Sequence, residues 1–88
     1  MRAVYKYALP IDDFIRVPLP KGARVLTVQM QGDTPCMWVL VDPSAPEEMR
    51  RFRLAGTGHE LPADGLEYVG TFQMRGGALV FHPFEMTP

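Results

Sequence analysis

TFQMRGGALVFH, residues 71–82, is the stretch that decides the fold class. Apolar residues recur at every second position on both sides of Gly76-Gly77, a dipeptide in which both residues accept a positive φ. This pattern predicts a β-hairpin with a two-residue turn. The expected cross-strand pairs are Phe72–Phe81, Met74–Leu79 and Thr71–His82. The first two pairs are expected to share the face that is turned toward the core.

Glycine and proline are spread through the rest of the chain and supply 8 and 9 of its 88 residues. The segments between them are short and rich in Val, Leu, Phe and Tyr, which is typical of a small all-β domain. We therefore predict a single β domain over residues 1–88, an antiparallel sandwich or barrel of about seven short strands. The expected strands are residues 2–8, 13–19, 23–31, 35–42, 49–56, 66–74 and 78–84.

A second hairpin is expected where Gly32-Asp33 separates two apolar runs. The expected pairs are Val28–Met37 and Leu26–Val39. Pro35 weakens this prediction because proline donates no hydrogen bond to a ladder.

The one segment with helical signals is SAPEEMRR, residues 44–51. Ser44 and Glu47 have the spacing of a capping box. Pro43 and Pro46 limit the segment to at most one helical turn.

Chain length and CMWVLV, residues 36–41, both favour a homo-oligomer. A domain of this size hides only about 60–65% of its unfolded surface when it folds alone. An antiparallel strand with one solvent-exposed face alternates between polar and apolar residues. CMWVLV is apolar throughout, which indicates that both of its faces are covered. Either a second subunit provides the second cover, or Trp38 caps the edge of an ordinary core.

Charge and cysteine content restrict the partners and the location. The net charge of −1, from 9 basic and 10 acidic side chains, disfavours a binder of duplex nucleic acid or of anionic membranes. Cys36 is the only cysteine, so no internal disulfide forms, which indicates a reducing setting. MRAVYKYALP, residues 1–10, lacks the form of a signal peptide, and no apolar run reaches the length of a membrane span. We therefore expect a cytoplasmic protein.

Residues with catalytic or metal-binding chemistry are few. The available metal ligands are His59, Glu60, His82 and Glu85, and neither pair has zinc spacing. Cys36 lies in the most apolar strand, where a thiol is usually inert. Ser44 is the only serine and lies near prolines. We expect no catalytic residue, no metal and no cofactor, and therefore no enzyme.

The candidate binding site lies around FRLAGTGHELP, residues 52–62. Arg51 and Arg53 stand on one outer face of a strand that runs into the stretch Gly56 to His59. No helix follows, so the stretch is neither a dinucleotide-binding fingerprint nor a P-loop. Backbone amides around its glycines could form a nest for a phosphate that the two guanidinium groups also bind. Alternatively, the glycines only permit positive φ in a tight turn, and the residues alone favour this turn.

Aromatic residues complete the expected site. Tyr5 and Tyr7 share one face of the first strand, as in surfaces that stack bases beside basic side chains. A tyrosine pair at this spacing is nevertheless more often part of a core. The residues assigned to ligand binding are Arg51, Arg53, Thr57, Gly58, His59, Tyr5 and Trp38.

Four stretches together resemble a family of small tailed-phage proteins. They are VYKYALP (4–10), LPKGARVLTVQMQGDTPCMWVLVDP (19–43), RFRLAGTGHELP (51–62) and LEYVGTFQMRGGALVFHPFE (66–85). The most distinctive pieces are Pro35-Cys36 with Trp38, Gly56 to His59, Gly70 to Gln73, and Phe81-His82. The resemblance extends to the anti-CBASS sponges of phages, oligomers such as tetramers that bind cyclic dinucleotides, for example 3′3′-cyclic GMP-AMP.

The resemblance implies a phage immune-evasion protein that sequesters a cyclic nucleotide signal in the host cytoplasm without cleaving it. It assigns no binding residue by position, so the candidate site rests on the residues themselves. Two other functions remain open. One is a phage structural or protein-interaction module with a partner surface at Trp38. The other is a binder of single-stranded nucleic acid, which the near-neutral charge disfavours.

Overall fold

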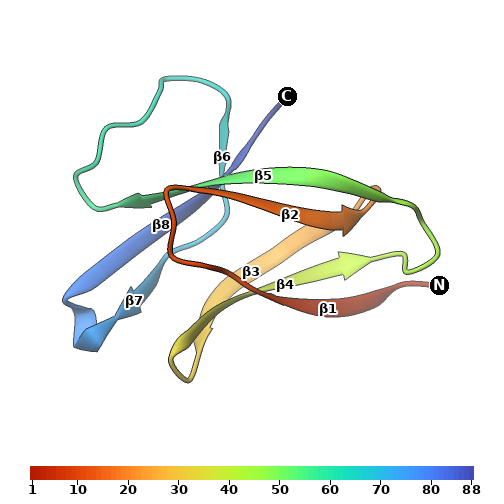
Figure 1. Ribbon diagram of the computed structural model, residues 1–88, viewed down its shortest axis with the longest axis horizontal. Coiled ribbons are helices and arrows are strands. Elements are labelled where there is room, and N and C mark those ends of the chain that lie inside the picture. The colour runs from red at the N-terminus through yellow and green to blue at the C-terminus, as the bar shows by residue number, and fades with distance from the viewer.

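Two antiparallel sheets make up the fold in the computed structural model, which describes residues 1–88 (Figure 1). The three-stranded sheet has the order β1 (Ala3–Ala8), β4 (Thr34–Val41), β3 (Arg24–Gln31). The five-stranded sheet has the order β2 (Phe14–Pro20), β5 (Glu47–Gly56), β8 (Leu79–Met86), β6 (Leu66–Tyr68), with β7 (Phe72–Met74) also paired to β8. The predicted all-β antiparallel class is confirmed. No helix long and apolar enough to cross a membrane is present.

There are eight strands instead of about seven because the expected strand over residues 66–74 divides into β6 and β7. Both pieces pair with β8, along successive parts of it. Between them the Val69 N–H donates to the Pro83 carbonyl oxygen at 3.0 Å. Gly70 lies against β3, since a Cβ built on it would stand 3.7 Å from the Val28 Cβ. The break therefore lets this segment approach the other sheet.

The hairpin that was expected at Gly76-Gly77 is present. Phe72 lies opposite Phe81 and Met74 opposite Leu79, as predicted. Gly76 and Gly77 have φ values of 65° and 95°, and the Ala78 N–H donates to the Arg75 carbonyl oxygen at 3.2 Å, which closes the turn. The assignment of Leu79 to the core was wrong. Leu79 is 37% exposed because it lies next to the turn of the hairpin, at the edge of the core.

The Gly32-Asp33 hairpin is also present, and Val28 lies opposite Met37 as predicted. The expected pairing of Leu26 with Val39 was wrong. A bulge shifts the register there, so Val25 lies opposite Val39 and Leu26 is 45% exposed. One extra residue on one strand moves its neighbours out of alternation.

Residues 43–45 form a turn and a bend, and no helical turn develops from the capping-box spacing. The Asp42 carboxylate accepts hydrogen bonds from the Ser44 N–H at 3.0 Å and from its hydroxyl at 2.7 Å. These two bonds lower the pKa of Asp42. Ser44 therefore completes a turn with Asp42, and β5 begins at Glu47. The one helical segment is a 3-10 turn over Arg75–Gly77.

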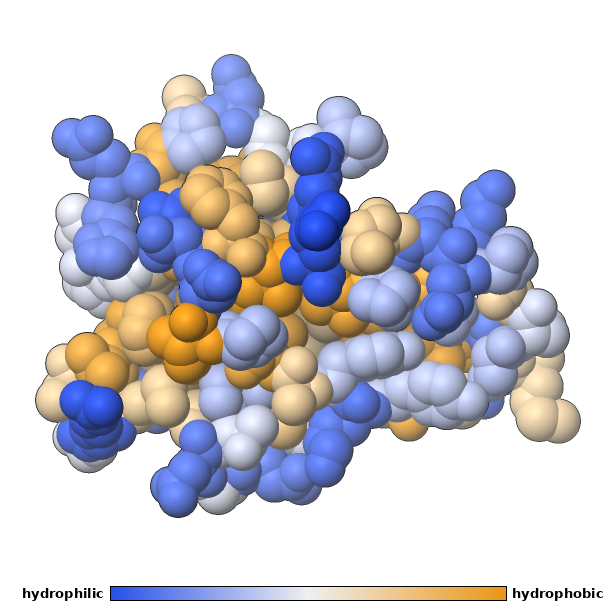
Figure 2. Space-filling view, in the orientation of Figure 1, coloured by the Kyte–Doolittle hydropathy of each residue, from blue (hydrophilic) through white to orange (hydrophobic).

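The core lies between the two sheets and draws on both. Its buried residues are Leu9, Ile15, Val17, Leu19, Ala23, Val28, Met37, Val39, Val41, Phe52, Leu54 and Phe72. Figure 2 shows hydrophobic side chains in the middle of the viewed face and hydrophilic ones mainly around its rim. The continuous apolar run of β4 divides accordingly. Met37, Val39 and Val41 are buried, whereas Trp38 and Leu40 on the opposite face are half-buried.

Candidate functional site

The outer face of the five-stranded sheet carries most of the chemistry of this chain. Side chains of β5 point alternately inward and outward, and the register of β2, β8 and β6 identifies the outward residues of those strands. The outward residues with polar or aromatic side chains are Phe14, Arg16, Arg51, Arg53, Tyr68, His82 and Phe84. Thr57 follows β5 at one end of this face, and we call the whole set the outer face.

Arg16 and Arg51 form a like-charged pair on the outer face. They are directly opposite each other on β2 and β5. Both are exposed, and the only ion pairs of the structure involve other residues. Like charges directly opposite each other on a sheet are destabilising. A bound anion would remove this repulsion and gain two charge-assisted partners.

Arg53 lies on the same face as Arg51, as predicted, but its guanidinium group is already engaged. It donates to the carbonyl oxygens of Leu54 at 2.8 Å and Asp13 at 3.3 Å. The Asp13 carboxylate lies 3.5 Å away, and the Phe14 ring centroid lies 5.2 Å from the Arg53 Cζ atom. The Arg53 side chain is only 15% exposed. It therefore fastens the start of β2 to β5.

The stretch Gly56 to His59 is a tight turn in which three of four backbone amides have partners within the chain. The Gly56 N–H donates to the His59 Nδ1 atom at 3.2 Å, and the His59 N–H donates to the Gly56 carbonyl oxygen at 3.1 Å. The Thr57 N–H donates to the Val80 carbonyl oxygen at 3.3 Å, and Gly58 has a φ of 90°. The geometry favours the turn over the anion nest.

His82 is the centre of a hydrogen-bonded chain of side chains on the outer face. Its Nε2 atom lies 2.7 Å from the Thr57 hydroxyl, and its Nδ1 atom lies 2.9 Å from the Thr71 hydroxyl. The Tyr68 hydroxyl lies 2.6 Å from that of Thr71. Four side chains from separate segments thus form one relay, which we call the His82 relay.

A pocket of about 200 Å³ adjoins the His82 relay. Thr57, His59 and His82 contribute polar groups to its lining, and Tyr68 and Phe84 contribute aromatic walls. The Tyr68 and Phe84 rings meet edge to face, with centroids 5.6 Å apart. Binding pockets for whole small molecules are usually about 300–1,000 Å³. This pocket therefore suits one ring of a larger ligand.

Tyr5 and Trp38 lie on the other sheet and do not join this site. Tyr5 is opposite Val39, and Lys6 is opposite Trp38, so Tyr5 and Trp38 are on different faces of the three-stranded sheet. The residues assigned from sequence thus fall into separate groups: the arginines of β5, the turn that follows it, and the two aromatics. Of the residues added by the structure, Thr71 and His82 had a sequence signal, because the hairpin register already placed them opposite each other.

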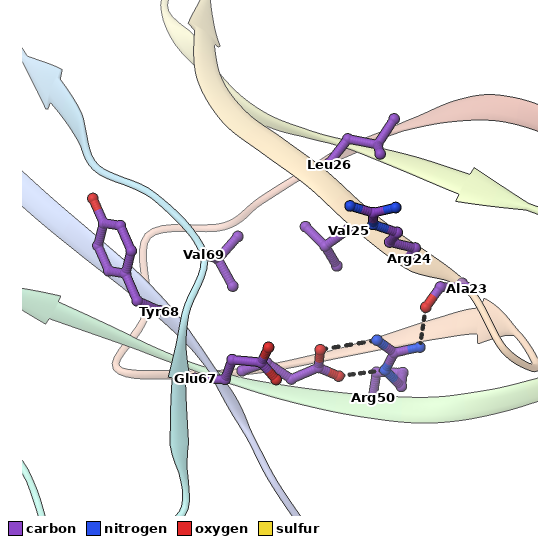
Figure 3. A pocket seen from close by; sticks show the side chains of 9 residues that line it. Ala23, Arg24, Val25, Leu26, Arg50, Glu67, Tyr68 and Val69 are labelled. Atoms are coloured by element: carbon purple, nitrogen blue, oxygen red, sulfur yellow. Dashed lines mark hydrogen bonds and ion pairs between the residues drawn. The ribbon is translucent and has the colours of Figure 1, made fainter.

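A larger pocket of about 410 Å³ lies between β3 and β6 (Figure 3). Arg50 donates there to both carboxylate oxygens of Glu85 and, at 2.8 Å, to the Ala23 carbonyl oxygen. The bond to Glu85 raises the pKa of Arg50. Because Arg24 and Arg50 face Glu67 and Glu85 in the lining, the pocket has no net charge to attract an ion.

Comparison with known families places the chain in one of them. A model described as "Domain of unknown function (DUF7352)" matches residues 1–88, so the chain belongs to this family. No curated protein and no solved structure matches it. No group of three or more His, Cys, Asp or Glu side chains is placed to hold a metal ion.

Proposed function

We propose that this DUF7352 protein binds a cyclic dinucleotide on its outer face and sequesters it without cleaving it. The resemblance to phage sponges motivates the ligand class, and with it a role in immune evasion in the cytoplasm of an infected bacterium. On this proposal the arginine pair holds phosphate and the neighbouring aromatics contact the bases.

The observation that carries the proposal is the pair Arg16–Arg51. Two arginines directly opposite each other, with no acidic partner, are an electrostatic cost that a purely structural sheet would avoid. Exposed Phe14 and Tyr68, on the same face, supply flat apolar surface of the kind on which bases stack. An anion with flat rings fits both features together.

Sequestration without turnover agrees with the chemistry of the outer face. The Thr57 hydroxyl lies 2.7 Å from the His82 Nε2 atom, which is the spacing of a nucleophile and its general base, and His59 is bonded to the Gly56 amide. A general base also needs a third group that orients it. No carboxylate stands in the His82 relay to orient an imidazole as a general base. We therefore expect the ligand to be released unchanged.

The test is thermal unfolding with 3′3′-cyclic GMP-AMP, followed by chromatography of the ligand. A ligand at a hundred times its Kd contributes about 2.7 kcal/mol, which raises the Tm of a domain of this size by roughly 10 °C or more. Inorganic pyrophosphate is the control for anion binding alone. An unchanged Tm, or recovery of a linear product that disappears in His82→Ala, would contradict the proposal.

The homo-oligomer, a tetramer in the phage sponges that the sequence resembles, is a further part of the proposal. Trp38 and Leu40 are half-buried on the side of the three-stranded sheet that is turned away from the core, and exposed Val4 of β1 lies opposite Leu40. This apolar surface also suits the alternative function, a protein-interaction module without a nucleotide ligand. We expect Trp38→Asp to dissociate the assembly in light scattering. If the unmodified protein is a monomer at micromolar concentration, the proposed homo-oligomer is contradicted.

A further inference from the structure

The hydrogen bonds of the His82 relay depend on the tautomer of His82. Its members run from Tyr68 through Thr71 and His82 to Thr57, with separations of 2.6, 2.9 and 2.7 Å. A neutral imidazole has one nitrogen that donates and one that accepts. A hydroxyl has one hydrogen to donate and two lone pairs that accept, so the Thr71 hydroxyl can also accept from both of its neighbours. The His82 tautomer therefore decides whether Thr57 accepts from the His82 Nε2–H or donates to the Nε2 atom.

When the relay points toward Thr57, its last hydroxyl is free to donate outward. Tyr68 then donates to Thr71, Thr71 to the Nδ1 atom of His82, and the His82 Nε2–H to Thr57. Thr57 is one of the residues that line the pocket of about 200 Å³, so in this arrangement its hydroxyl can donate to an acceptor bound there. Hydrogen bonds in such a chain polarise one another, so the final donor is strengthened.

Two further donors belong to the lining of the same pocket. The Nδ1 atom of His59 accepts from the Gly56 N–H, so the neutral ring carries its proton on Nε2. The Nε2–H has no partner within the protein, and neither has the backbone N–H of Gly58. Leu61, Tyr68 and Phe84 provide apolar wall around these groups. The pocket thus has a mainly apolar lining, to which His59, Gly58 and Thr57 can add hydrogen-bond donors.

We infer that this pocket binds guanine through the edge that carries its N7 and O6 atoms. That edge presents two adjacent acceptors, whereas adenine presents an acceptor at N7 and a donor at N6. A pocket that presents two donors to this edge therefore selects guanine over adenine. The inference rests on the proposed function, because the base belongs to the nucleotide whose phosphate Arg16 and Arg51 hold.

The placement of the two parts agrees with a single ligand. His82 is opposite Ala55 on β5, four residues beyond Arg51 on the same outer face. At about 3.3 Å per residue this is a separation of roughly 13 Å along the strand. Between them lie Arg53 and Phe84, opposite each other, so the face is continuous from the arginine pair to the pocket.

The test compares cyclic di-GMP with cyclic di-AMP by calorimetric titration. We expect the unmodified protein to prefer cyclic di-GMP by on the order of ten- to a hundredfold, the discrimination of a good two-point base contact. Thr57→Val removes the final donor, and Tyr68→Phe removes the first hydroxyl of the relay while keeping the ring. Thr57→Val should lose most of this preference and still bind, and Tyr68→Phe should lose a smaller part of it. Thr27→Val on the other sheet is the matched control and should keep it.

The outcomes separate this inference from the proposed function. Equal affinity for the two ligands, or a preference that persists in Thr57→Val and Tyr68→Phe, would overturn guanine selection and leave sequestration intact. Absence of binding by the unmodified protein to either ligand would overturn both. Tyr68 is 61% exposed, so Tyr68→Phe is expected to fold, and its Tm checks this directly.

Discussion

Arg50 and Arg51 are neighbours in sequence, but their side chains lie on opposite faces of β5 and have different surroundings. Arg50 points inward from β5, where Glu85 and the Ala23 carbonyl oxygen bind it and its side chain is 19% exposed. Arg51 points outward, is exposed, and faces Arg16. One arginine connects the five-stranded sheet to the segment before β3, and the other has no partner in the chain. The same residue type is thus structural on one face of the strand and available for a ligand on the other.

The largest expected effect on stability concerns Arg50, the arginine with a structural role. Arg50→Gln leaves the partly buried Glu85 carboxylate without its guanidinium partner and removes charge-assisted hydrogen bonds. We expect a loss of roughly 2–4 kcal/mol in the free energy of unfolding. Arg51→Gln should lose nothing. Chemical denaturation of both variants measures the difference, and equal stability of the two would refute the division of roles.

A smaller effect on stability is expected from the repulsion between Arg16 and Arg51. Arg16→Glu converts the like-charged pair with Arg51 into an opposite-charged one. We expect a gain of about 0.2–1 kcal/mol in the free energy of unfolding at low salt, and less of it at high salt. Ligand binding should weaken in the same variant. A decrease in stability would mean that an acidic group elsewhere already compensates Arg16.

The smallest effect concerns the carboxylates. Glu85 is held by Arg50, whereas Asp42 is exposed and bonded only to Ser44. Because the folded pKa of Asp42 is lowered from its usual 3.8, its contribution to stability is present above that value and is lost as the pH falls through the lowered pKa. Ser44→Ala should move the Asp42 pKa back toward the usual value in an NMR titration. If the Asp42 pKa does not move in Ser44→Ala, a group other than the Ser44 hydroxyl lowers it.

The sequence predicted the local pairings well. Both hairpins were found from short turn signals, because Gly76-Gly77 and Gly32-Asp33 fix the register of the strands that they join. The bulge at Leu26 was not predictable in this way, since the apolar alternation continues through Leu26 and no turn signal marks the position. The division of residues 66–74 depends on contact with β3, which no local signal encodes.

The candidate site was predicted only in part, for the same reason. Alternation placed Arg51 and Arg53 on one face. It gave no hint that Asp13 and Phe14 would engage Arg53, or that Arg16 would face Arg51, because both follow from the pairing of β2 with β5. These strands are far apart in the chain, and their register is set by the whole sheet.

Titration of 3′3′-cyclic GMP-AMP into the unmodified protein, Arg16→Gln and Arg51→Gln is the most direct test of the central claim. Each charge-assisted contact contributes on the order of 1.5–3 kcal/mol, so each variant should bind roughly ten- to a hundredfold more weakly. Neither variant should be less stable than the unmodified protein, since neither side chain has a partner in the fold and each substitution removes the repulsion between them. Unaltered affinity in both folded variants would contradict the account and place any ligand away from the outer face.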